Sequence, residues 1–140
     1  MATGEAVEVL LVEDDPDQVR LLKALSRKCS VPVRLQVATN GVEALELLRG
    51  TPGPSAPLRT QLVLLDLDLP ELDGRAVLTE IRSDPRLART PVVIVSASRQ
   101  TSDVQHAYHH RANGYLHKPI VVEDLDALLL QVLTRAKRWA

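Results

Sequence analysis

The chain has 140 residues, enough for one domain with a hydrophobic core, and a formal net charge of −1 from 17 basic and 18 acidic residues. Hydrophobic residues make up 45% of the sequence, which excludes a chain disordered by composition, and no basic stretch dominates, so a nucleic-acid partner is not expected. The single cysteine, Cys29, excludes an intrachain disulfide, and the first residues resemble neither a signal peptide nor a membrane span, so we expect a cytoplasmic protein.

The first elements alternate between strand and helix. An apolar run predicts a strand over 7–12. Asp15 as N-cap and Pro16 as first helical residue then mark a helix that continues to about residue 28. Alternating apolar and polar residues over 31–38 predict a second strand, at an edge of the sheet.

The middle of the chain continues this alternation. Asn40 and Gly41 open a second helix, and the three prolines and two glycines of residues 50–60 predict a loop. The most apolar strand is expected over 61–66, followed by a loop over 67–73 and a third helix.

The last third supplies two more strands, over 91–96 and 114–117, each followed by a helix, over 101–111 and from 121 to about 138. Five strands alternating with five helices predict a doubly wound α/β sandwich, with one parallel sheet and helices on both faces. We expect a single domain over 1–140, with no output domain after the fifth helix.

Several strands end at a polar group that can take part in chemistry. The strand ends carry Glu13 and Asp14, then Asp66, Ser96 and Lys118. In parallel sheets the working site lies outside the carboxyl ends of the strands, so these groups are expected at one edge. An acidic cluster, a hydroxyl and a lysine together suit a divalent cation and a phosphoryl group.

The three carboxylates of Glu13, Asp14 and Asp66 predict a Mg²⁺ site. Two unit charges about 4 Å apart repel by about 4 kcal/mol at an effective dielectric near 20, so such a cluster calls for a cation. Oxygen ligands of this kind suit Mg²⁺, and zinc is not expected because no Cys or His is nearby in the sequence.

The remaining chemistry follows from the same residues. Asp66 ends the most apolar strand and is the natural nucleophile, since a carboxylate can form an acyl phosphate. Lys118 can neutralise phosphoryl charge, and Ser96 can donate a hydrogen bond to a phosphoryl oxygen. Taken singly, Ser96 reads as a turn residue, Lys118 as a surface lysine and Glu13–Asp14 as a cap or solvated pair; their combination favours a phosphoryl site.

At these residues the sequence resembles a response-regulator receiver domain of two-component signalling. The resemblance covers nearly the whole chain and rests on four stretches in order, 9–16, 63–74, 92–97 and 112–119. It implies a flavodoxin-like fold and a sensor histidine kinase or histidine phosphotransfer protein as partner.

The resemblance also implies a role for each acidic residue. Asp66 would be the phosphoacceptor and Asp14 a direct Mg²⁺ ligand. Glu13 would act through metal-bound water, and the backbone carbonyl of Asp68 would complete the metal shell. The Asp68 side chain is a departure, because it adds a carboxylate at a position that varies in the family.

Four further residues take implied roles in switching. Ser96 would be the switch hydroxyl, and Tyr115 the switch aromatic that turns inward when Ser96 moves to the phosphate. Lys118 would contact the phosphate, and the bond from Lys118 to Pro119 is expected to be cis. The surface of the fourth helix, fifth strand and fifth helix would then change, for protein contacts or phosphorelay.

Softer features resemble the small regulators paired with phytochrome-type histidine kinases. They are the stretches 66–70 and 82–87 and the Pro/Gly-rich insert before the central strand. This narrower resemblance implies a homodimer formed through the fourth helix, fifth strand and fifth helix.

Two alternatives remain. Asp66 and Asp68 match the Asp-x-Asp motif of haloacid-dehalogenase-type phosphatases, although that motif belongs on a first strand. The chain could also be a receiver-fold binding module that takes no phosphate. His106 and His110 lie four apart on one helix face, where a solvated surface is the preferred interpretation over a metal pair or a pH-sensitive dimer face.

Overall fold

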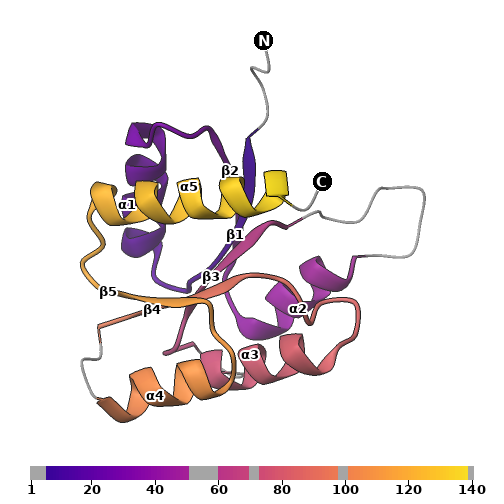
Figure 1. Ribbon diagram of the computed structural model, residues 1–140. Helices are drawn as coiled ribbons and strands as arrows, with labels where there is room; N and C mark the ends of the chain where they lie inside the picture. Colours follow the sequence, from indigo (N-terminus) through magenta and orange to yellow (C-terminus); the bar gives the residue numbers. More distant parts are fainter. Residues whose placement is uncertain (1–5, 51–59, 70–72, 98–100, 139–140) are drawn as a thin grey trace.

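The computed structural model describes residues 6–50, 60–69, 73–97 and 101–138. They form five strands and five helices in strict alternation (Figure 1). In chain order the elements are β1 (Val7–Val12), α1 (Pro16–Lys28), β2 (Val33–Ala38), α2 (Gly41–Arg49), β3 (Leu62–Asp66), α3 (Gly74–Ser83), β4 (Val92–Ser96), α4 (Thr101–His109), β5 (Gly114–His117) and α5 (Val122–Arg138). The predicted loop over 50–60 and the centre of the loop over 67–73 lie largely outside the described residues.

The five strands form one parallel sheet in the order β2-β1-β3-β4-β5. The chain therefore starts near the middle, moves to one edge with β2, and returns across the sheet. This confirms the predicted doubly wound fold and the edge position of the second strand. The order reverses between β1 and β3, and in such sheets the ligand crevice lies at that switch point.

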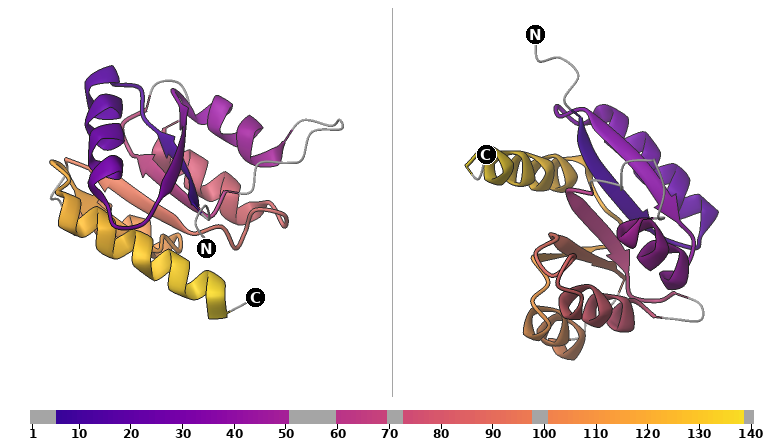
Figure 2. Two further views of the ribbon diagram at one scale, coloured as in Figure 1. Left: turned by 90° about the horizontal axis from the view of Figure 1, so that it is seen from above. Right: turned by 90° about the vertical axis from the view of Figure 1, so that its right-hand side faces the viewer.

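The sheet lies between two layers of helices (Figures 1 and 2). Alternate residues of each strand belong to the two hydrophobic cores on opposite faces of the sheet. On one face, Leu10, Val63 and Ile94 pack with the buried residues of α2, α3 and α4. On the other, Leu11 and Leu64 pack with those of α1 and α5. Because both faces are covered, the central strands are apolar throughout, which explains the uninterrupted hydrophobic runs in the sequence.

Helices α1, α2 and α3, each of which follows the carboxyl end of a strand, begin with a residue whose side chain caps the helix. Asp15, Asn40 and Asp73 accept hydrogen bonds from backbone N–H groups in the first turns of α1, α2 and α3. Asp15 is therefore a helix cap, as predicted, and its side chain has a structural task.

Two predicted boundaries were wrong by two residues. The second strand begins at Val33 rather than at 31, because Pro32 has no N–H to donate to the ladder. Helix α4 ends at His109 rather than at 111, because Arg111 adopts a left-handed backbone with φ of 65°. The N–H groups of Arg111 and Ala112 bond back to Tyr108 and Ala107, a Schellman ending that usually uses glycine.

The guanidinium of Arg82 at the end of α3 supports that ending. It donates to the carbonyl of Arg111 at 2.8 Å and 3.1 Å, to the carbonyl of Thr90 at 2.7 Å, and to Oδ1 of Asn113 at 2.9 Å. The loops before β4 and β5 are thus tied to α3. Within the described residues, no helix is both long and apolar enough to cross a bilayer.

Candidate functional site

The carboxyl ends of the strands bring the polar groups predicted from the sequence to one edge of the sheet. Within the described part of the chain, the buried polar side chains are those of Glu13, Asp66 and Ser96, at 3%, 4% and 1% exposure. Asp66, the last residue of β3, is aligned with Val95, so Ser96 at the end of β4 lies one residue further along the sheet. Burial of two carboxylates at a strand end is costly unless something stabilises the charge.

Glu13, Asp14 and Asp66 form a group that could hold a metal ion. Each offers a carboxylate oxygen, and these oxygens lie within 4.8 Å of one another. Glu13 and Asp66 are buried, whereas Asp14 is exposed to solvent at the mouth of the group. The sequence thus predicted correctly that these three residues come together.

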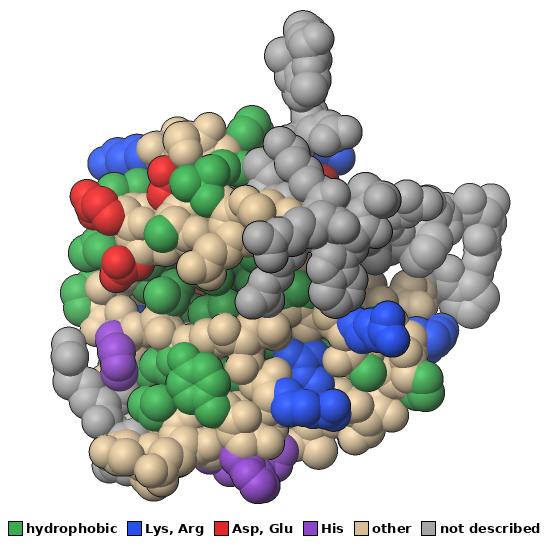
Figure 3. Space-filling model, in the orientation of Figure 1, with side chains coloured by type: hydrophobic (Ala, Val, Ile, Leu, Met, Phe, Trp, Pro, Cys, Tyr) green, Lys and Arg blue, Asp and Glu red, His purple; other side chains and the backbone are tan. Residues whose placement is uncertain are grey.

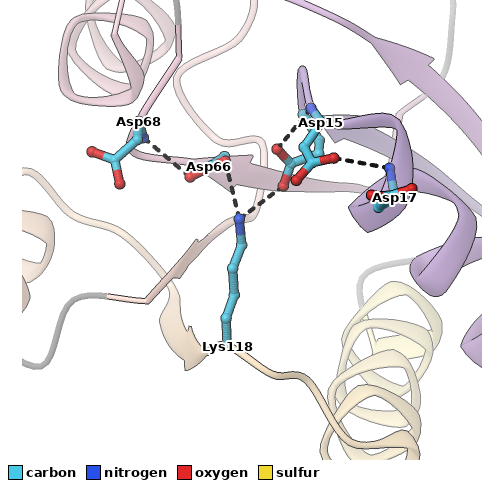
Figure 4. A network of polar contacts seen from close by, with 6 residues as sticks. Asp15, Asp17, Asp66, Asp68 and Lys118 are labelled. Carbon is cyan, nitrogen blue, oxygen red and sulfur yellow. Dashed lines mark hydrogen bonds and ion pairs between the residues drawn. The ribbon is translucent and has the colours of Figure 1, made fainter.

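Lys118 places its ammonium between two of these carboxylates (Figure 4). Its Nζ lies 2.9 Å from Oε1 of Glu13 and 3.1 Å from Oδ2 of Asp66. Burial alone would lower the pKa of Lys118, but its contacts with Glu13 and Asp66 outweigh burial and raise the pKa above its ordinary value. Lys118 is therefore a charged group held by the site.

The charge at this site is incompletely balanced. Burial, together with the hydrogen bond and negative charge of Asp66, raises the pKa of Glu13 from 4.5 to about 7, although Lys118 acts in the opposite direction. The single positive charge that Lys118 supplies does not neutralise two buried carboxylates. An all-oxygen cluster with excess negative charge fits Mg²⁺, which prefers oxygen ligands and is held by one or two carboxylates.

Backbone groups fix both buried carboxylates. Oδ1 of Asp66 accepts the N–H of Asp68 at 3.1 Å, and Oε2 of Glu13 accepts the N–H of Asp15 at 3.2 Å. Figure 4 shows the carboxylate of Asp68 turned away from Lys118, and this side chain is exposed. The backbone of Asp68 orients Asp66, while its side chain points elsewhere.

Gly74 is a structural requirement that the sequence did not reveal. Its N–H donates to the carbonyl of Leu67 at 3.0 Å, so α3 starts against the end of β3. A Cβ at this position would lie 2.3 Å from the backbone oxygen of Asp66 and 2.7 Å from Cα of Leu67. The sequence predicted only that the loop over 67–73 ends here, and the close approach depends on the sheet geometry.

Ser96 and Tyr115 occupy neighbouring strands near the site. Ser96 is buried at the end of β4, and its carbonyl accepts the N–H of Lys118 at 2.9 Å. Tyr115 is half-buried on β5, packs against the core under α2, α3 and α4, and has its ring 5.0 Å from that of His117. The bond from Lys118 to Pro119 is cis, as expected.

Comparison with known proteins identifies the family. The response regulator receiver domain matches residues 9–130. Probable methanogenesis regulatory protein FilR2 of Methanothrix harundinacea is 37% identical over 124 residues, which are 89% of this chain and 79% of that protein. Response regulator Rcp1 of Synechocystis is 36% identical over 117 residues, or 84% of this chain and 80% of Rcp1.

Solved structures agree with this result. The phosphorylated cyanobacterial phytochrome response regulator RcpA superposes with a TM-score of 0.75 at 35% identity, covering 91% of both chains. The Mn²⁺-bound form of Rcp1 gives a TM-score of 0.70 at 32% identity, covering 89% of this chain and 90% of that one. The phosphatase alternative is not supported, because Asp66 lies at the end of β3 rather than of a first strand. The chain belongs to the response regulator receiver domain family.

Proposed function

We propose that this protein is a phosphorylation-dependent response regulator whose phosphoacceptor is Asp66. The observation that carries the proposal is the contact of the Lys118 ammonium with the buried carboxylates of Asp66 and Glu13, with Asp14 close to both. A fixed carboxylate beside a cation on a long side chain is an arrangement that suits phosphoryl transfer to a side chain.

The proposed step is attack by a carboxylate oxygen of Asp66 on the phosphorus of a phosphohistidine in a sensor kinase or phosphotransfer protein. A phosphorus–oxygen bond forms, and the phosphorus–nitrogen bond breaks with its electron pair returning to the imidazole. The N–H of Asp68 on one oxygen and Nζ of Lys118 on the other hold the Asp66 carboxylate in one orientation. Holding the nucleophile in place lowers the entropic part of the barrier.

The ammonium of Lys118 would move with the negative charge from the carboxylates to the phosphoryl group during this step. It is bound to both Glu13 and Asp66 before transfer, and its long side chain allows the ammonium to move to a phosphoryl oxygen afterwards. Ser96, buried one strand away at the end of β4, would donate its hydroxyl to another phosphoryl oxygen. Each contact strengthens as negative charge collects on the transferring group.

Mg²⁺ is the proposed cofactor, held by Glu13, Asp14, Asp66 and the backbone carbonyl of Asp68. When bound, it would neutralise carboxylate and phosphoryl charge and favour transfer. The support from this chain is the oxygen-only ligand set of Glu13, Asp14 and Asp66, whose carboxylate oxygens lie within 4.8 Å of one another. Related support comes from Rcp1, whose structure has been solved with Mn²⁺.

The proposed output is a change in the surface of α4, β5 and α5. Movement of Ser96 to the phosphate would free space for Tyr115, which is half-buried at present, and shift the population between two states of this surface. A homodimer through this surface and a phytochrome-type kinase as partner are part of the proposal. The phytochrome-type partner is supported by the similarity to RcpA, which is a phytochrome response regulator.

Intact mass spectrometry after incubation with acetyl phosphate tests the proposal. With Mg²⁺, the wild type should gain one adduct of about 80 Da, the mass of one HPO₃, as expected of a carboxylate nucleophile. The adduct should be absent with EDTA and in Asp66→Asn. An adduct of equal yield in Asp66→Asn would contradict the assignment of Asp66, and no adduct from acetyl phosphate or from a phosphorylated histidine kinase would favour a binding module.

A further inference from the structure

The end of helix α4 and the residue that follows it carry three of the four histidines of the chain. They are His106, His109 and His110. Histidine side chains gather at the lower edge of the surface in Figure 3, where Figure 1 places α4. His106 and His110 are half-buried, whereas His109 is exposed. The carboxylate cluster of Glu13, Asp14 and Asp66 does not include them.

His110 directly follows α4, and its N–H still donates to the carbonyl of His106 at 3.0 Å, so the two residues lie on the same helical face. Their ring centroids are 4.1 Å apart, with planes inclined by 33°, whereas His109 and His110 are 5.3 Å apart and nearly edge to face. Two histidines four apart on one helix face can bind a single zinc ion. With Zn–N bonds of about 2.0–2.1 Å, two nitrogens on one ion are at most about 4 Å apart, which these neighbouring rings can reach.

A second observation also favours metal binding by His110. Its Nδ1 lies 3.0 Å from the backbone carbonyl of His106. Because a carbonyl oxygen only accepts, Nδ1 carries the proton, and Nε2 of the neutral ring retains its lone pair. Metal-binding histidines have this arrangement, in which one ring nitrogen donates to a backbone carbonyl and the other binds the ion.

Two charged groups of opposite sign, Arg75 of α3 and Asp103 of α4, act on His106. The guanidinium of Arg75 pairs with the carboxylate of Asp103 at 2.7 Å, so these two charges offset each other beside the histidine pair.

We propose that His106 and His110 form a second metal site that binds one divalent transition ion such as Zn²⁺. Imidazole nitrogens suit zinc, whereas the oxygen cluster at the strand ends suits Mg²⁺, so the two sites differ in ligand chemistry. An ion bound to residues four apart fixes the last turn of α4. It binds the folded helix in preference to the unfolded chain and therefore stabilises the protein.

Isothermal calorimetry with Zn²⁺, in excess Mg²⁺ to fill the carboxylate cluster, tests this inference. The wild type should bind one Zn²⁺ per chain. His106→Gln and His110→Gln should each weaken binding by about tenfold or more, because each removes one of two protein ligands. His117→Gln, which changes the histidine on β5, is the matched control and should bind as the wild type does.

Thermal unfolding provides a second readout on the same variants. Zn²⁺ should raise the unfolding midpoint of the wild type and of His117→Gln, and should leave His106→Gln and His110→Gln unchanged. Unaltered circular dichroism would show that all variants are folded. Equal zinc affinity in the wild type and both α4 variants, or an equal loss in His117→Gln, would overturn the proposal.

Discussion

Nζ of Lys118 lies 2.9 Å from Oε1 of Glu13, although 105 residues separate them in the chain. The contact joins the end of β1 to the end of β5 across the carboxyl edge of the sheet. Glu13 is 3% exposed, so this ion pair is largely withdrawn from water. A buried pair of this kind is sensitive to pH, to loss of either partner and to added cations.

Stability of the metal-free protein should fall between pH 4.5 and 7 because of Glu13. Burial, first among the causes, raises its pKa in the folded state to about 7, so the folded state holds a proton that the unfolded state has already released. The stability associated with that proton is fully present below pH 4.5 and is lost as pH rises through 7. The expected loss is on the order of 2 kcal/mol.

Urea unfolding in EDTA at pH 5 and pH 7.5 measures this effect. Glu13→Gln is permanently neutral and should lose less stability than the wild type over the same range. Other groups titrate in both proteins, so the difference between the two isolates Glu13. An identical pH dependence in wild type and Glu13→Gln would show that Glu13 is not the titrating group.

Lys118→Met should slow phosphorylation from acetyl phosphate at saturating Mg²⁺. The variant loses hydrogen bonds between an ammonium and two carboxylates, each worth about 1.5–3 kcal/mol, so a decrease of about tenfold to a hundredfold is expected. Lys23→Met, at an exposed position of α1, is the control and should react at the wild-type rate. A Lys118→Met rate within twofold of the control would remove Lys118 from the mechanism.

Gly74→Ala should destabilise the protein by about 1–3 kcal/mol, since the added methyl group would overlap backbone atoms of Asp66 and Leu67. Relief of that overlap displaces the end of β3, so Mg²⁺ affinity should fall as well. Gly114→Ala is the matched control, because a Cβ there would lie 3.4 Å from a Val93 methyl carbon. Denaturant unfolding and Mg²⁺ titration should give lower stability and lower Mg²⁺ affinity for Gly74→Ala than for Gly114→Ala. Equal stability and equal affinity in the two variants would contradict the steric argument.

Ser96→Ala should separate phosphorylation from its output. Asp66 would still take up phosphate, but the buried hydroxyl that we propose moves to the phosphate would be missing. Analytical ultracentrifugation should then show a smaller phosphate-dependent change in self-association than in the wild type. Full phosphate-dependent association in Ser96→Ala would mean that another group couples the site to the surface of α4, β5 and α5.

The sequence predicted the fold and the gathering of Glu13, Asp14, Asp66 and Lys118 because each feature has a local signal. Apolar runs mark buried strands, and parallel strands place their carboxyl ends at one edge whatever the loop details. Asp15 was identified as a cap because Pro16 follows it, and the structure confirms the cap.

Features that depend on distant segments were not predicted. The overlap at Gly74 arises only once α3 is laid against β3. The left-handed Arg111 at the end of α4 lacks the usual glycine signal and is stabilised by Arg82, from another helix. The pairing of Glu13 with Lys118 joins opposite ends of the sequence, so its effect on the pKa of Glu13 could not be read locally.

The central claim is that Asp66 carries the phosphoryl group, and borohydride reduction followed by peptide mass spectrometry tests it most directly. Borohydride reduces an aspartyl phosphate to homoserine, which marks the modified residue permanently. After treatment with Mg²⁺ and acetyl phosphate, we expect homoserine at position 66 and unmodified aspartate at positions 14 and 68. Homoserine at position 14 or 68 in place of position 66 would contradict the account.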